Sequence, residues 1–176
     1  SNSRHQMKVK VKIGAKKDGT IEACDIYALS DQGAYGYHAF TTLNLVGNKT
    51  LPLYSRMRAA RFFGQVVYTN KLPGGAFRGY GAVQGTFALE SMVNKLAKEL
   101  NMDPVELRLK NTVREGEKTL AYGIDVKSCK LNECIEKARE MIEWDKYYPF
   151  KEEKDKIISV GMAIAQQGSG IQNVDT

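Results

Sequence analysis

The alternation near the start of the chain restricts the fold more than any other feature of the sequence. Between Met7 and Gly14, three apolar residues alternate with three lysines. Because successive side chains of a strand point to opposite faces, this period of two predicts a half-buried strand with a solvated lysine face. The Lys-Asp-Gly-Thr sequence at 17–20 supplies a tight turn, and residues 21–29 predict a second strand. We therefore expect residues 7–29 to form a hairpin.

Helical patterns dominate the middle of the chain. Leucines and a valine at helical spacing predict a helix over residues 84–100. Asp103 and Pro104 then provide an N-cap and a first helical residue, so a short helix is expected through about residue 110. A further helix is predicted over 128–144, where apolar residues again recur at helical spacing.

The remaining segments complete the fold class. A strand is expected at 58–69, and the segment 41–53 predicts either a short helix or a loop. A charged connector at 147–156 leads to an apolar run at 157–165 that predicts a buried strand. Strands followed by helices and then another strand indicate an α+β architecture, a mixed sheet with a group of helices packed on it.

The extent of the chain and its overall composition narrow the class of protein. The chain starts without an initiator methionine on the polar residues 1–6, which is typical of an internal piece of a longer protein. We expect residues 1–176 to form one fragment of a larger domain, with a sub-boundary near 146–156. Hydrophobic residues make up 43% of the chain, which excludes a disordered segment. No apolar run approaches the ~20 residues of a membrane span, so we expect a cytoplasmic protein without a membrane partner.

Cysteine content and charge bear on two further classes. The three cysteines are odd in number and lack Cys-x-x-Cys spacing, so we expect no metal site made by this chain. The net charge of +6 leaves open an acidic partner or nucleic acid. A basic nucleic-acid-binding module that uses Lys8, Lys10 and Lys12 is therefore the alternative function. No recognised nucleic-acid motif supports it, and nucleic acid is not the expected partner.

The segment 71–84 carries the clearest chemical signal. It lies between an expected strand and an expected helix, and it contains four glycines around Arg78. Glycines let the backbone approach a ligand, and a helix N-terminus favours negative charge, so an anion-binding loop is the favoured interpretation. The alternative is a structural turn with a surface arginine. Gly79-x-Gly81 does not fit the dinucleotide fingerprint, because position 84 is Gln.

A second polar loop occupies residues 166–173, directly after the expected C-terminal strand. Glycines and amide side chains at this place suit a polar ligand. A plain connecting loop explains the same composition.

The residues from Gly75 to Gln84 read Gly-Ala-Phe-Arg-Gly-Tyr-Gly-Ala-Val-Gln. This stretch resembles the Ala-Phe-Arg-Gly-aromatic-Gly-x-x-Gln segment of the molybdopterin-binding large subunit of xanthine dehydrogenases and aldehyde oxidoreductases, the molybdenum hydroxylases. The Asp-Pro-Val-Glu-Leu-Arg sequence from Asp103 follows at the family spacing. Because the Arg4-His5 opening and the glycine-rich loops also come in family order, the resemblance covers nearly the whole chain.

The resemblance implies roles for particular residues. Ala76, Phe77, Arg78 and Gly79 correspond to positions that bind the molybdenum–pterin cofactor, which is molybdopterin or its cytosine dinucleotide form. Tyr80 corresponds to the aromatic residue that stacks on a planar substrate.

Further downstream, Gln172 and Asn173 correspond to the substrate pocket. The catalytic base of the family, a glutamate, is expected beyond Thr176. The resemblance therefore assigns no catalytic residue to this chain and implies that the chain alone is inactive.

The resemblance also implies a reaction and a set of partners. The expected reaction is hydroxylation of a heteroaromatic substrate, purine- or nicotinate-like, or of an aldehyde, with water as the oxygen source. Iron–sulfur clusters and FAD in other domains or subunits, together with the remainder of this subunit, are the expected partners. Vertebrate xanthine enzymes carry a substrate-orienting arginine upstream of the cofactor arginine. Here residues 43–48 read Leu-Asn-Leu-Val-Gly-Asn, so purine specificity of that kind is not implied.

Overall fold

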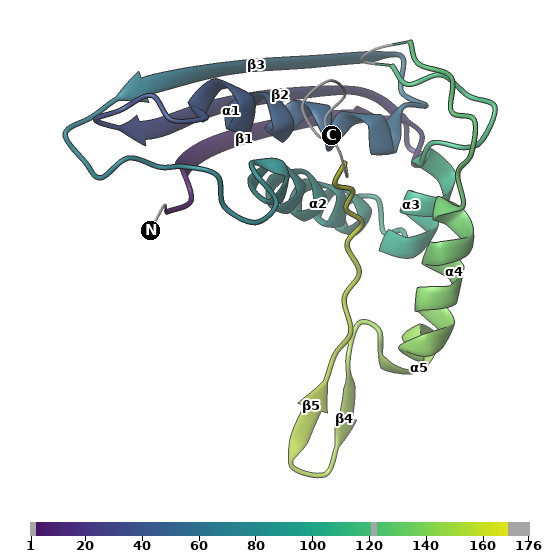
Figure 1. Cartoon of the computed structure of the whole chain (residues 1–176). Coiled ribbons are helices and arrows are strands. Elements are labelled where there is room, and N and C mark those ends of the chain that lie inside the picture. Colours follow the sequence, from purple (N-terminus) through teal and green to yellow (C-terminus); the bar gives the residue numbers. More distant parts are fainter. Residues whose placement is uncertain (1–2, 121–122, 169–176) are drawn as a thin grey trace.

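The computed structural model describes residues 3–120 and 123–168 of the 176-residue chain (Figure 1). The elements follow one another in this order: β1 (Gln6–Ala15), β2 (Ile21–Gly33), α1 (Ala39–Asn48), the 3₁₀ helix η1 (Leu51–Tyr54), β3 (Ala59–Tyr68), α2 (Ala82–Glu99), α3 (Pro104–Asn111), α4 (Leu131–Met141), α5 (Trp144–Tyr147), β4 (Lys151–Glu153) and β5 (Lys156–Ile158). This order of strands and helices confirms the α+β class.

Strands β1, β2 and β3 form a mixed three-stranded sheet in that order. β1 and β2 pair antiparallel, which confirms the expected hairpin, and β2 and β3 pair parallel. A parallel pair needs a crossover connection, and α1 with η1 supplies it. The register places Lys10, Tyr27 and Phe63 side by side across the outer face of the sheet. Lys8 and Lys12 are exposed on the same face, as the alternation predicts.

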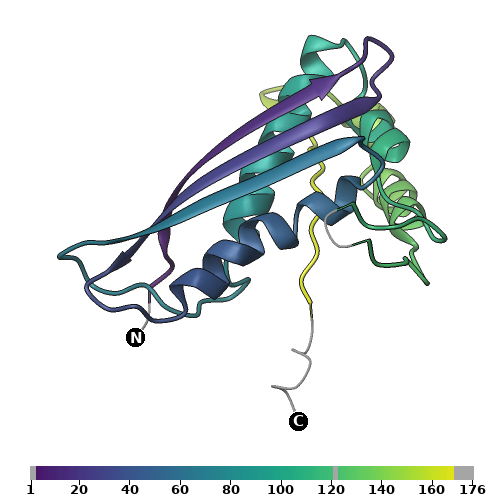
Figure 2. The ribbon, with the colours of Figure 1, turned by 90° about the horizontal axis from the view of Figure 1, so that it is seen from above.

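Helices α1 and α2 cover the other face of the sheet (Figures 1 and 2). Ile26 of β2 is fully buried there, together with Val46 of α1 and Val93 of α2. Burying an aliphatic side chain of this size contributes about 1.5–3 kcal/mol, so this layer is the main source of stability. The two helices approach so closely at Gly85 that a Cβ on this residue would lie 2.3 Å from the Val46 carbonyl oxygen.

Helix α3 begins where the sequence predicts. Asp103 is the N-cap, and its carboxylate accepts hydrogen bonds from the amides of Val105 at 2.7 Å and Glu106 at 3.2 Å. Pro104 occupies the first helical position, where its missing N–H has no cost. The second carboxylate oxygen accepts a hydrogen bond from Trp144 Nε1 at 2.8 Å, so the cap also ties α5 to α3.

A buried polar network connects η1, α2 and α3. Arg108 is fully buried and donates to Glu90 from Nε at 2.9 Å and from Nη2 at 2.7 Å. Glu90 also accepts hydrogen bonds from the Tyr54 hydroxyl and, at 2.8 Å, from the Ile164 amide. Burial, with the Glu90 charge beside it, raises the pKa of Tyr54 well above its ordinary value, so its hydroxyl stays protonated and donates.

The third predicted helix, over 128–144, is present but interrupted. α4 ends at Met141 and α5 starts at Trp144. Glu143 between them has φ 50°, in the left-handed region, which breaks the helical hydrogen bonding. The segment 41–53, where a helix or a loop was expected, contains most of α1 and the start of η1.

The buried strand expected at 157–165 is wrong. Only residues 156–158 form a strand, β5, which pairs with β4 in a hairpin where a plain connector was expected. Residues 159–168 have no regular secondary structure. Ile164 is buried and Met162 packs against the core, so the apolar pattern reflects contact with the helices. A strand also needs a neighbour for its backbone groups, and within the described ranges this segment has none.

Candidate functional site

The loop between β3 and α2 carries most of the residues singled out by the sequence. Gly79 and Gly81 have φ values of 86° and 98°, and Tyr80 between them has φ 46°. A Cβ at Gly81 would lie 1.9 Å from a carbonyl oxygen of α1. A larger residue there would push the loop away from α1, so the glycines set the course of the backbone that follows Arg78.

Backbone hydrogen bonds hold the first half of this loop in place. The amide of Gly74 donates to the carbonyl oxygen of Gln32 at the end of β2, at 3.1 Å. The amide of Gly75 donates to the carbonyl oxygen of Ser3 at 2.9 Å. The loop therefore lies against both the end of β2 and the segment that precedes β1 (Figure 1).

Lys71 adds a side-chain anchor to the same loop. Its Nζ lies 2.8 Å from the carboxylate of Asp31, which also accepts a hydrogen bond from the Thr69 hydroxyl at 2.6 Å. The Lys71 hydrogen bond, helped by that of Thr69, lowers the pKa of Asp31 to about 2. Asp31 is therefore ionised at neutral pH and keeps the start of the loop on β2.

The predicted cofactor residues lie together on the second half of the loop. Ala76, Phe77 and Arg78 are exposed, and Gly79 is half-buried. The Arg78 carbonyl oxygen accepts a hydrogen bond from Arg4 Nη2 at 2.7 Å. The Arg78 guanidinium itself makes no hydrogen bond or ion pair within residues 3–120 and 123–168, so its donors are available to an anionic ligand.

Tyr80, the predicted substrate residue of the loop, is half-buried and lies against His38. Its hydroxyl forms a hydrogen bond with His38 Nδ1, and the two rings meet edge to face with 5.5 Å between their centroids. His38 is the residue that precedes α1, and sequence reasoning did not single it out. The other two predicted substrate residues, Gln172 and Asn173, lie outside the described residues.

Three polar side chains beside the loop also escaped sequence reasoning as site residues. Arg4 Nη1, both ring nitrogens of His5 and Gln84 Oε1 are buried without a hydrogen-bond partner in the described part of the chain. Burial lowers the pKa of His5 more than a weak contact with the Tyr37 backbone raises it, so its ring is neutral at neutral pH. A Cβ at Gly74 would lie 2.7 Å from that ring, which explains the glycine there. Buried polar atoms are usually paired, so these atoms are unusual. They are not confined to the loop, because the hydroxyls of Ser30, Thr42 and Thr86 are also buried without a partner among the described residues.

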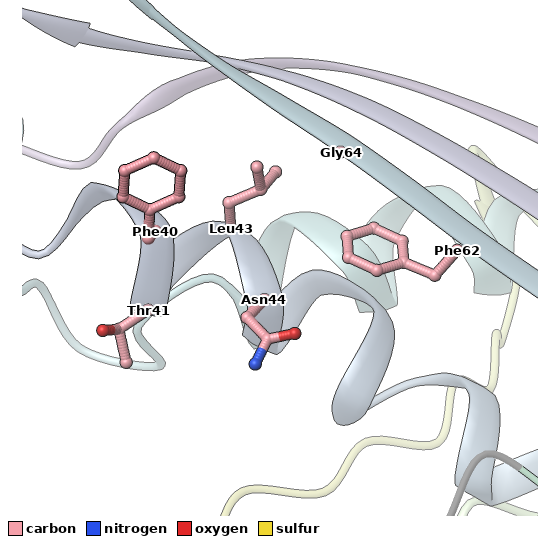
Figure 3. A pocket seen from close by; sticks show the side chains of 6 residues that line it. All are labelled: Phe40, Thr41, Leu43, Asn44, Phe62 and Gly64. Carbon is pink, nitrogen blue, oxygen red and sulfur yellow. The ribbon is translucent and has the colours of Figure 1, made fainter.

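An apolar pocket of about 400 Å³ lies between α1 and β3 (Figure 3). Its lining residues are Phe40, Thr41, Leu43, Asn44, Phe62 and Gly64. None of them is charged, so this pocket offers no counter-charge to an anion. The loop around Arg78 is therefore the better candidate for an anionic ligand.

Two other kinds of site are not found in the part of the chain that the structure describes. No group of three or more His, Cys, Asp or Glu side chains is placed to hold a metal ion there. No helix among the same residues is both long and apolar enough to cross a membrane.

A glycine-rich loop, with an arginine whose guanidinium has no partner among the described residues, is the candidate site for an anionic ligand. Comparison with known families shows which family the chain belongs to. Residues 1–112, more than half of the chain, match the family described as the molybdopterin cofactor-binding domain. The chain belongs to this family, and the nucleic-acid-binding alternative is not favoured.

Named relatives agree with the family. The chain is 40% identical to the putative xanthine dehydrogenase molybdenum-binding subunit XdhA of Escherichia coli K12, over 83% of this chain and 19% of that protein. It is 35% identical to the nicotinate dehydrogenase large molybdopterin subunit of Eubacterium barkeri, over 80% of this chain and 33% of that protein. Among solved structures, the aldehyde oxidoreductase from Desulfovibrio gigas superimposes with a TM-score of 0.71 at 35% identity, covering 81% of this chain and 15% of that one. The chain thus spans a minor part of the proteins it resembles.

Proposed function

We propose that this chain lines the cofactor and substrate site of a molybdenum hydroxylase. The proposed reaction is hydroxylation of a heteroaromatic substrate, purine- or nicotinate-like, or of an aldehyde, with water as the oxygen source. The observation that carries the proposal is the exposed Arg78 guanidinium, which has no hydrogen bond or ion pair with the described residues and sits in a loop of a chain that belongs to the molybdopterin cofactor-binding family.

The residues of the loop fit an anionic pterin cofactor, molybdopterin or its cytosine dinucleotide form. Arg78 would bind an anionic oxygen through its planar fork of N–H groups. The cofactor could approach the backbone closely at Ala76, Phe77 and Gly79. Ala76 has a small side chain, Gly79 has none, and Phe77 is turned toward Arg4. When bound, the molybdenum–pterin group supplies the redox chemistry, and the task of the chain is to bind and orient it.

Tyr80 is the proposed contact to the substrate. Its ring can stack on a flat, electron-poor ring, while its hydroxyl is held by His38. Gln172 and Asn173 are proposed to add amide donors and acceptors. Residues 43–48, which lie in α1, contain no arginine, so a guanidinium from that place does not orient the substrate. This favours nicotinate-like rings or aldehydes over strict purine specificity.

The rest of the machinery is proposed to lie outside this chain. XdhA is about five times as long as the matched region, since the chain covers 19% of it. The catalytic base and the remaining cofactor contacts would come from the remainder of the subunit. Iron–sulfur clusters and FAD would come from other domains or subunits.

The test uses the complete subunit with its partner subunits. We expect it to contain molybdenum and pterin and to transfer heavy oxygen from labelled water into xanthine, nicotinate or an aliphatic aldehyde, as read by mass spectrometry. The purified 176-residue chain, in contrast, should contain no molybdenum. A complete subunit without molybdenum, or product oxygen that comes from dioxygen, would contradict the proposal. Stoichiometric molybdenum in the chain alone would contradict the division of the site between this chain and the rest of the subunit.

A further inference from the structure

Arg4, near the N-terminal end of the described sequence, contacts the candidate cofactor loop. It belongs to the short segment before β1, which lies along the loop: Ser3 and Gly74 form a parallel β-bridge, and Gln84 Nε2 of α2 donates to the His5 carbonyl oxygen at 3.2 Å. This segment is therefore held between the loop and α2. The position of its backbone brings the Arg4 side chain to residues 77 and 78 of the loop. The contacts of Lys71 and Gly74 with β2 do not restrain this part.

The Arg4 guanidinium makes two different contacts with consecutive loop residues. Nη2 donates to the carbonyl oxygen of Arg78 at 2.7 Å. The guanidinium carbon lies 4.8 Å from the centre of the Phe77 ring, within the range of a cation–π interaction. One contact restrains the backbone at 78 and the other restrains the side chain at 77. Together they restrain the backbone of residues 77 and 78, from which the Arg78 side chain projects.

A third feature distinguishes Arg4 from an ordinary surface arginine. Its Nη1 is buried and has no hydrogen-bond partner in the described ranges. A buried donor on a charged group is costly when it is unpaired, so Nη1 is enclosed by the surroundings of the loop rather than hydrated. The printed contacts of the guanidinium with the described residues are those with the Arg78 carbonyl oxygen and the Phe77 ring.

We propose that Arg4 is a positioning residue of the cofactor site. It holds Phe77 and the Arg78 backbone so that the Arg78 guanidinium faces the cofactor before the cofactor arrives. This inference rests on the proposed function, because it assigns a ligand to the loop, but the contacts from which it is drawn do not depend on that ligand.

The experiment compares Arg4→Ala, Arg4→Lys and a control, Arg58→Ala, in the complete subunit. Arg58 precedes β3, at the opposite end of that strand from the loop, and its side chain is 83% exposed. Hydrogen exchange of the loop amides at 76–80 is measured on cofactor-free protein. Molybdenum content is measured on the protein as purified. Thermal melting is measured on both samples.

For Arg4→Ala we expect loop exchange about tenfold faster, the effect of losing one charge-assisted hydrogen bond, and lower molybdenum content at an unchanged melting temperature. Arg4→Lys should lie between Ala and wild type, since it keeps the charge and a donor group but loses the planar fork. Arg58→Ala should match wild type in all three measurements.

Two results would overturn the inference. One is wild-type loop exchange and molybdenum content in Arg4→Ala. The other is a fall in melting temperature for both Arg4 variants, with exchange faster throughout the protein, which would mean that Arg4 supports the fold. If the wild-type subunit itself holds no molybdenum, the proposed function fails, whereas the exchange measurement still decides the role of Arg4.

Discussion

The polar groups around Glu90 and those around Arg78 are organised in opposite ways. Arg108 is 0% exposed, yet it donates to Glu90, to Asn94 Oδ1 at 2.8 Å and to the Pro104 carbonyl oxygen at 2.9 Å. The Arg78 guanidinium, by contrast, is exposed and has no partner in the described part of the chain. Both regions flank α2, one at its middle and one at its N-terminus.

This difference separates scaffold from site. A buried charge is tolerated only when its hydrogen bonds are complete, and the Glu90 network meets this condition within the chain. It joins η1, α2 and α3 and also receives the Ile164 amide. The loop region leaves donors and acceptors open at Arg4, His5 and Gln84. The exposed Arg78 guanidinium, rather than these buried atoms, is therefore the group of the loop that a ligand can reach.

The largest effect is expected from Arg108→Ala. Removing one partner of a buried ion pair leaves Glu90 charged and unpaired, which should lower the free energy of unfolding by about 3–5 kcal/mol. Lys137→Ala is the matched control, because Lys137 forms an exposed pair with Glu140 and such pairs contribute under about 1 kcal/mol. Urea denaturation of the purified chain measures both. Equal losses for the two variants would mean that the network is not the scaffold.

Arg78→Ala should show the reverse behaviour. The melting temperature should stay unchanged, because the exposed guanidinium makes no hydrogen bond or ion pair with the described residues. Molybdenum content of the complete subunit should fall, because a charge-assisted hydrogen bond to an anion is worth about 1.5–3 kcal/mol, roughly tenfold to a hundredfold in affinity. Arg78→Lys should recover part of the molybdenum content, because it keeps the charge but loses the planar fork. A lowered melting temperature at full molybdenum content would assign the loop to the scaffold.

Asp103 belongs to the scaffold, and its loss should destabilise the chain less than Arg108→Ala does. Asp103→Ala removes the cap of α3 and the acceptor for Trp144, so we expect a loss of about 0.5–2 kcal/mol from the cap and about 1 kcal/mol more from the indole hydrogen bond. Asp103→Asn keeps a capping oxygen and should lose only the hydrogen bond from the Trp144 indole. Denaturation curves measure the difference. A large change in turnover at unchanged stability would contradict a purely structural role.

The comparison also explains what the sequence could and could not predict. The hairpin and the start of α3 were predicted because their signals, an alternation and a cap, lie within a few residues. The Arg78 loop was predicted from local glycines and from the family resemblance.

The partners of that loop were not predicted. Arg4 lies 74 residues from Arg78, and His38 lies 42 residues from Tyr80. Nothing local in the sequence records such contacts, which depend on the parallel pairing of β2 with β3. The error at 157–165 has the same origin, since an apolar run identifies a contact surface but not a strand partner.

The smallest effect concerns Tyr80, which lies where scaffold and site meet. If its ring faces the substrate, stacking contributes about 0.5–1.5 kcal/mol beyond burial. Tyr80→Ala should then weaken turnover of nicotinate or xanthine more than that of an aliphatic aldehyde, with the melting temperature little changed. Tyr80→Phe keeps the ring but loses the hydrogen bond to His38, so it should lose less on the aromatic substrate.

His38→Ala separates stacking from orientation. If the hydroxyl serves only to hold the ring through His38, then His38→Ala and Tyr80→Phe should have similar effects, and the double variant should be no worse than either single one. Kinetics on one aromatic and one aliphatic substrate, beside melting curves, provide the measurement. Equal losses on both substrates with a lowered melting temperature would place Tyr80 in the scaffold with Glu90. Additive losses in the double variant would instead give the Tyr80 hydroxyl a contact of its own with the substrate.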